Sequence, residues 1–142
     1  MGRVVHEYTS KIKPNVEEVV KDLSYTGAAV IIDSTPVDTT KAVANWKVAQ
    51  GAPFGGIVGE RVAGSKKGSG STAAKAQMKA EAYGRIATFK NAVPLFISNR
   101  VPYIGVLEYG DSKHRPHGMV SKGLQAMRLR AKSLRILKPQ KT

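Results

Sequence analysis

The chain has 142 residues, of which 42% are hydrophobic and 23% charged, and its formal net charge is +13. This length fits one domain spanning 1–142 with a real hydrophobic core and is too short for a multidomain enzyme. No run of about 18 apolar residues is present, so we expect no membrane span, and the lack of cysteine excludes disulfides, thiolate zinc sites and a cysteine nucleophile.

The positive charge is concentrated in the second half of the chain. Residues 1–71 contain nine basic and seven acidic side chains, whereas residues 72–142 contain 14 basic and three acidic ones. A basic half of this kind indicates an acidic partner, which is nucleic acid, a membrane surface or an acidic protein face.

A long N-terminal helix is predicted over 15–34. Asn15 is its expected N-cap, with Glu18 three residues on, and Pro36 ends the helix because the residue before a proline avoids helical backbone. The predicted buried stripe of this helix consists of Val16, Val19, Val20, Leu23, Gly27, Val30 and Ile31.

Two strands and a loop are predicted next. Residues 44–50 alternate apolar and polar side chains as a half-buried strand does, and residues 54–62 are predicted to return as the second strand of a hairpin. We expect the stretch 51–71 to be a flexible loop, because seven of its 21 residues are glycine. Gly59 and Gly64 have the spacing of a phosphate-binding loop, but Ser65 stands where that loop requires lysine, which favours an ordinary loop.

The next predicted element is a helix over 72–90, whose alanine-rich sequence favours helix formation. Its expected core stripe consists of Met78, Ala82, Ile86 and Phe89. A short apolar strand over 93–98, a short helix over 102–109 and an irregular elbow over 115–118 follow.

The last predicted helix runs over 119–137 and is part of a basic C-terminal helix and tail over 119–142. Its expected apolar seam consists of Val120, Leu124, Met127, Ala131 and Leu134. Between these positions lie Lys122, Arg128, Arg130, Lys132 and Arg135, and no acidic residue follows Asp111. These cations indicate either a surface for an acidic partner or a solvated helix face, and both interpretations stay open. Taken together, the elements predict an α+β fold, in which helices pack on a short sheet of about three to four strands.

Catalytic and metal chemistry find little support in the sequence. His114 and His117 are spaced to approach one metal ion, but zinc and iron sites need three or four protein ligands, so a surface or packing role is favoured. Asp111, Ser112 and His114 have the residue types of a catalytic triad, yet neighbours in one loop rarely achieve its geometry. We therefore expect no catalytic residue, no metal and no cofactor.

Two sequence blocks carry a resemblance to a known family. Residues 99–112 read NRVPYIGVLEYGDS and residues 116–120 read PHGMV, while residues 35–39 read TPVDT and residues 45–48 read NWKV. Over roughly 15–130, this pattern resembles the neck or tail-completion proteins of long-tailed bacteriophages, also called minor tail or head–tail joining proteins. The chain departs from the family at Thr40, where glycine is frequent, and at His114 and Arg115, where Gln-Ala is common.

The resemblance implies a virion structural protein rather than an enzyme. It implies a homo-oligomeric ring, hexameric or dodecameric, at the head–tail junction of a particle assembled in the host bacterial cytoplasm. The implied partners are further copies of the chain, the phage connector or stopper protein, and the tail terminator or tail tube, with transient contact to packaged DNA and none to a membrane. The implied structural and oligomer-interface residues are Trp46, Pro102, Tyr103, Leu107, Glu108, Tyr109, Gly110, His117 and Gly118.

Individual roles follow from the same resemblance. Glu108 is expected to pair with a basic residue within or between subunits, and the loop 51–71 is expected to order against the next ring or to line the channel. The basic residues of 122–141 are expected to face an acidic protein surface, because a strongly basic lumen would retain the DNA that must slide through it. The alternative class is a basic nucleic-acid-binding module, favoured by the sequence pI of about 10.2.

Overall fold

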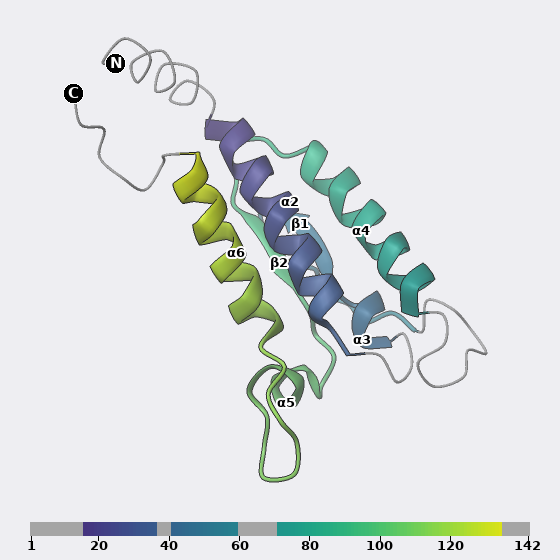
Figure 1. Cartoon of the computed structure of the whole chain (residues 1–142). Coiled ribbons are helices and arrows are strands. Elements are labelled where there is room, and N and C mark those ends of the chain that lie inside the picture. Colours follow the sequence, from purple (N-terminus) through teal and green to yellow (C-terminus); the bar gives the residue numbers. More distant parts are fainter. Residues whose placement is uncertain (1–15, 37–40, 60–70, 135–142) are drawn as a thin grey trace.

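Three helices lie side by side over a two-stranded sheet in the computed structural model, which describes residues 16–36, 41–59 and 71–134 (Figure 1). The elements are α2 (Val16–Ser34), α3 (Lys41–Ala44), β1 (Lys47–Gln50), α4 (Ser71–Ala87), β2 (Leu95–Ser98), α5 (Ile104–Tyr109) and α6 (Met119–Ser133). The helices predicted at 15–34 and 72–90 and the strand predicted at 93–98 are confirmed, with bounds that differ from the prediction by one to three residues at an end. The α+β class is confirmed as well.

Helix α2 occupies the middle of the helical layer. Figure 1 shows α4 on one side of it, α6 on the other and the sheet behind it, and α2 packs against both helices. The predicted stripe is only partly right, since Gly27 and Ile31 are buried but Val16, the first residue of the helix, is 51% exposed. A helix with neighbours on two sides needs a wide face of small and branched residues. The buried residues of α2 are Ser24, Gly27, Ala28, Ile31 and Ile32.

The core lies between α2, α4 and the inner face of the sheet. The predicted stripe of α4 is confirmed, because Met78 and Ile86 are fully buried and Ala82 is nearly so. These three residues follow each other at intervals of four and therefore lie along one face of the helix. Phe89 continues this buried set just beyond the end of α4.

The sheet has fewer strands than the three to four predicted. In the described residues β1 pairs only with β2, antiparallel, with Lys47 opposite Ser98 and Gln50 opposite Leu95. The predicted hairpin is wrong over 54–59, which forms no strand. The side-chain amide of Asn45 bonds both backbone groups of Val58, so this segment is fixed by a side chain rather than by a strand ladder. The predicted strand also begins too early, because Ala44 ends α3.

The predicted seam of α6 is partly right, since Ala131 is buried and Val120 packs against the core, but the buried face is rotated away from Leu124. Leu124 is 53% exposed, whereas Met119, Gly123 and Ala131 are buried. Two glycines cause the rotation, because a β-carbon on Gly123 would lie 2.6 Å from Ile31 Cγ1 and one on Gly27 would lie 2.5 Å from Met127 Sδ. The helices α2 and α6 therefore approach closely at their glycines, and Leu124 is turned outward. The predicted end of this helix at 137 lies outside the described residues.

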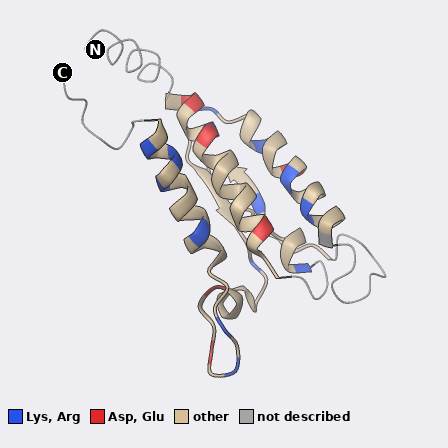
Figure 2. Cartoon of the chain, in the orientation of Figure 1, with Lys and Arg blue, Asp and Glu red and all other residues tan. Residues whose placement is uncertain are grey.

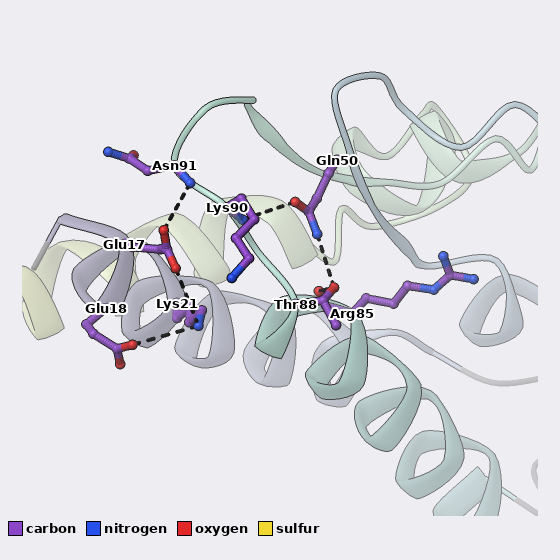
Figure 3. Close-up of polar contacts among 8 residues, drawn as sticks. All are labelled: Glu17, Glu18, Lys21, Gln50, Arg85, Thr88, Lys90 and Asn91. Carbon is purple, nitrogen blue, oxygen red and sulfur yellow. Dashed lines mark hydrogen bonds and ion pairs between the residues drawn. The ribbon is translucent and has the colours of Figure 1, made fainter.

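Polar contacts anchor the connection between α4 and β2 (Figure 3). The side chain of Gln50 at the end of β1 donates to Thr88 Oγ1 at 3.1 Å and accepts from the backbone N–H of Lys90 at 3.2 Å. The backbone N–H of Asn91 donates to the carboxylate of Glu17 on α2 at 3.3 Å. These bonds join the ends of three elements, and the backbone N–H of Gly51 extends the contact by donating to Pro94 at 2.8 Å. The start of β2 is thereby held beside the end of β1.

Candidate interaction site

The family-like block over 35–39 and 45–48 contributes to a buried joint between α2 and β1. The indole Nε1 of Trp46 donates to Thr35 Oγ1 at 2.8 Å, and this hydroxyl donates to the carbonyl of Ile31 at 2.7 Å. Trp46 is 5% exposed and Thr35 is 1% exposed. A buried N–H and a buried hydroxyl are both satisfied by these bonds, so Trp46 is a core residue of the described chain.

Two asparagines complete this framework. Asn45 bonds the carbonyl of Lys41 as well as the backbone of Val58, all at 2.7 to 2.8 Å. Asn99 donates to the carbonyl of Ala42 at 2.8 Å and accepts from the backbone N–H of Val101 at 3.0 Å. Helix α3 is thus held from both sides by side-chain amides, which offer a donor and an acceptor at the same position.

Within the part of the chain that the structure describes, Glu108 binds backbone groups rather than a basic side chain, and its pairing with another subunit stays a prediction. Its carboxylate accepts from the backbone N–H groups of Val120 at 2.8 Å and Ser121 at 3.3 Å, in the first turn of α6. The residue before this helix is Gly118, which has φ +58° and no side chain to cap it. Glu108 therefore caps α6 from a distance, where a negative charge also meets the positive end of the helix dipole.

The predicted elbow at 115–118 is part of a longer irregular segment over 110–118, which is called the elbow from here on. Further backbone bonds hold it in place. The N–H groups of His117 and Gly118 donate to the carbonyls of Leu107 and Glu108 at 2.8 and 3.1 Å. Gly110 has φ +74°, and a β-carbon there would lie 2.7 Å from the carbonyl oxygen of His114, so only glycine fits this turn. Together with the cap on α6, these bonds fix both ends of the elbow.

Asp111 organises the tip of the elbow. Its Oδ1 accepts from the backbone N–H groups of Lys113 at 2.9 Å and His114 at 2.8 Å, and it contacts the His114 ring at 2.8 Å. The bond from Lys113 and then that from the His114 side chain hold the pKa of Asp111 below its usual value. Asp111 and His114, which have the residue types of a catalytic triad, are in contact in the structure. The contact uses Oδ1, the same oxygen that accepts from the backbone of the turn. Ser112 contributes no described contact to this group.

These histidines form no metal centre in the described ranges. Nowhere in 16–36, 41–59 and 71–134 do three or more His, Asp or Glu side chains lie together in a way that would hold a metal ion. His117 contributes its backbone N–H to the elbow and is itself exposed.

A groove of about 850 Å³ runs beside the elbow. Pro36, Ala42 and α5 form its apolar side, and the elbow forms its polar side. The lining residues are Pro36, Ala42, Tyr103, Val106, Leu107, Asp111, Lys113, His114, Arg115 and His117. The groove therefore includes three of the predicted interface residues, Tyr103, Leu107 and His117, all from the family-like block over 99–112 and 116–120.

Other predicted interface residues are exposed around the groove. Figure 1 shows α5 and the elbow at one end of the molecule, projecting beyond the three-helix layer. Tyr109 at the end of α5 is 81% exposed and Tyr103 is 42% exposed, and Pro102 is exposed beside them. The short helix predicted over 102–109 begins later in the structure, at Ile104, so Pro102 and Tyr103 precede α5.

The residues of the predicted basic surface have different environments in the structure. Lys122, Arg128 and Lys132 are exposed on α6, which contains no acidic residue (Figure 2). Arg130 instead makes a two-pronged bond to Asp22 on α2, with Nε–Oδ1 at 2.7 Å and the second contact at 2.9 Å. The hydrogen bond from Arg130 holds the pKa of Asp22 below its usual value. Arg135 lies outside the described residues.

Several contacts in this site left no signal in the sequence. Asp22 and Arg130 are 108 residues apart, and Asn45 reaches Val58 across an irregular segment, so neither pair follows a helical or strand period. Gly118 is a sequence signal for the contact of Glu108 with α6. A glycine at the N-cap position has no side chain to cap the helix, so another residue must supply the cap.

Comparisons with family models, curated proteins and solved structures found no match to this chain. Within the described ranges, no helix has both the length and the apolar character needed to cross a membrane.

Proposed function

We propose that this chain is a structural virion protein that forms a ring in the neck of a long-tailed bacteriophage and joins the head connector to the tail. The observation that carries the proposal is the division of the two family-like blocks into a framework and a projecting segment. Thr35, Asn45, Trp46 and Asn99 fix buried joints, whereas the block around α5 presents exposed side chains at one end of the molecule.

The projecting segment has the properties of a contact surface between subunits. Tyrosine is enriched at protein interfaces because it combines a large apolar ring with a polar tip, and Tyr109 is exposed almost completely. The elbow beside it is fixed by Glu108, Gly110 and Asp111, so little conformational freedom is lost when a neighbour binds. A contact between two different faces of identical subunits repeats around an axis and forms a ring when the rotation closes.

The basic surface is proposed to face an acidic neighbour in the particle. Lys122, Arg128 and Lys132 lie on α6 and are exposed, while Arg130 serves the packing of α6 on α2. At a net charge of +13, copies of the chain repel one another in solution, so we propose that the ring forms on an acidic connector or tail protein.

Cryo-electron microscopy of the particles whose genome encodes the chain tests this proposal. Averaging about the tail axis is expected to place a ring of this chain at the head–tail junction. A chain with Tyr109→Ser is expected to lose incorporation, whereas Val93→Ser, which replaces an apolar side chain 39% exposed elsewhere on the surface, keeps it. Absence of the chain from purified particles would contradict the proposal.

A nucleic-acid-binding module is the second candidate function. It is favoured by the exposed cations of α6, which carries no acidic residue. This function predicts that the isolated chain binds duplex DNA and that its affinity falls steeply with salt, because each phosphate contact releases counterions. Fluorescence anisotropy with a labelled duplex at several salt concentrations separates the two candidates, and the variant Arg128→Glu/Lys132→Glu checks that the bound surface is α6.

A further inference from the structure

The groove beside the elbow combines an apolar wall with an excess of positive charge. Val106 and Leu107 of α5 contribute to the apolar wall, together with Ala42. On the opposite side, Lys113 and Arg115 are exposed and form no ion pair with any described residue. A molecule that fills this groove meets apolar surface and cationic groups at the same time.

Asp111 supplies the carboxylate among the residues that line the groove, and it is bound to the turn of the elbow. Asp111 accepts two backbone N–H groups and contacts the His114 ring, all through Oδ1 at 2.8 to 2.9 Å. Asp111 keeps its negative charge, so the groove lining contains two cations, Lys113 and Arg115, against one carboxylate. The groove therefore presents a net positive rim to an occupant.

The rim is also held in position before anything binds. The elbow is tied at one end by His117 to Leu107 and by the cap of Glu108 on α6, and at the other end by the turn at Gly110. A preorganised site loses less conformational entropy on binding than a loose loop, so even a short segment can bind it.

We propose that this groove binds an acidic segment of a partner protein, in which an apolar side chain seats against α5 and neighbouring carboxylates meet Lys113 and Arg115. Charge complementarity selects this occupant in the groove over a second copy of the chain, because the chain itself has a net charge of +13. The contact between copies is proposed at Tyr109, which does not line the groove. The apolar wall selects a protein segment over a nucleic-acid backbone, which brings charge without aliphatic side chains. The inference rests on the proposed function only for the assumption that the projecting segment meets another protein.

A peptide titration followed by nuclear magnetic resonance tests the inference on the full ¹⁵N-labelled chain. The probes are short synthetic peptides in which Leu or Phe is flanked by Glu, the same peptides with Gln in place of Glu, and the same peptides with Ser in place of Leu or Phe. Added up to about 1 mM, the first set is expected to shift the backbone amide signals of 103–117, and the other two sets are expected to leave them in place.

Two charge-reversed variants locate the binding. Lys113→Glu/Arg115→Glu is expected to weaken binding of the Glu peptides at least about tenfold. Arg128→Glu/Lys132→Glu changes the net charge by the same amount on α6, away from the groove, and is expected to bind as the unaltered chain does. The amide spectra of both variants report whether each remains folded.

Several results with the peptides and the chain would overturn the inference. These are the absence of shifts with every Glu peptide, equal shifts with the Gln peptides, shifts confined to α6, and filling of the groove by a second copy, seen as shifts that depend on protein concentration alone. A DNA oligonucleotide that shifts 103–117 at lower concentration than the peptides would also overturn it. Peptide binding without a ring in the particle would contradict the proposed function and leave the groove assignment standing.

Discussion

Replacing Gly123 with alanine is expected to destabilise the chain, although alanine is the better helix former. A β-carbon at this position would lie 2.6 Å from Ile31 Cγ1, 3.0 Å from Ile31 Cδ1 and 3.2 Å from the carbonyl oxygen of Gly27. Ile31 is buried and branched at its β-carbon, so its side chain has few alternative rotamers, and the carbonyl belongs to the backbone of α2. The strain is relieved only if α6 moves away from α2.

The expected magnitude is a balance of two effects. Alanine gains about 1 kcal/mol over glycine inside a helix, and overpacking a tight contact costs about 1 to 3 kcal/mol. We expect Gly123→Ala to lower the free energy of unfolding by about 1 kcal/mol. Gly84 on α4 is the matched control, because a β-carbon there meets nothing within 4 Å. Gly84→Ala is expected to raise the free energy of unfolding by about 0.5 to 1 kcal/mol.

A third variant refines the comparison. A β-carbon at Gly27 would press on Met127 Sδ at 2.5 Å and Met127 Cγ at 2.9 Å, and a methionine side chain yields more easily than backbone. Gly27→Ala is therefore expected to fall between the other two variants. Urea unfolding followed by circular dichroism measures all three. If Gly123→Ala stabilises the chain as much as Gly84→Ala does, α2 and α6 do not meet at their glycines and the reasoning fails.

Three further predictions concern the polar contacts. Glu108→Ala is expected to lower the free energy of unfolding by about 1 to 2 kcal/mol through loss of the cap on α6, with Glu108→Gln intermediate, and an unchanged urea midpoint for Glu108→Ala would refute the cap. Trp46→Phe is expected to cost about 1 to 2 kcal/mol, because the indole bond to Thr35 is buried; full stability by thermal unfolding would show that this bond is dispensable. The pKa of Asp22 is lowered by Arg130, so its stabilisation is present above the ordinary value of 3.8 and is lost as the pH falls through the lower folded-state pKa. Asp22→Asn is expected to flatten the decline of stability in acid, and an unaltered pH profile of urea unfolding would contradict the pairing.

The sequence by itself determined the local elements of this protein. The helical spacing of Met78, Ala82 and Ile86 identified both α4 and its buried face, because that helix rests on the core with one side only. Pro36 bounded α2, and the apolar run at 93–98 predicted β2, since both depend on interactions among near neighbours. The exposed tyrosines of the α5 segment were also among the residues singled out from the sequence pattern.

Only the tertiary structure decided which elements pair and which face each helix buries. The partner of β1 is β2, which follows α4 in the sequence. The segment 54–59, which comes soon after β1, does not pair with it, because Asn45 holds that segment by side-chain bonds. The closeness of Gly27 and Gly123 turned Leu124 out of the seam that apolar spacing predicted, although Ala131 of that seam is buried. Glu108 and Arg130 carry charges that suggest partners outside the chain, yet each is bound within it. Contacts between residues distant in the sequence follow no period, and the chain must fold before those residues meet.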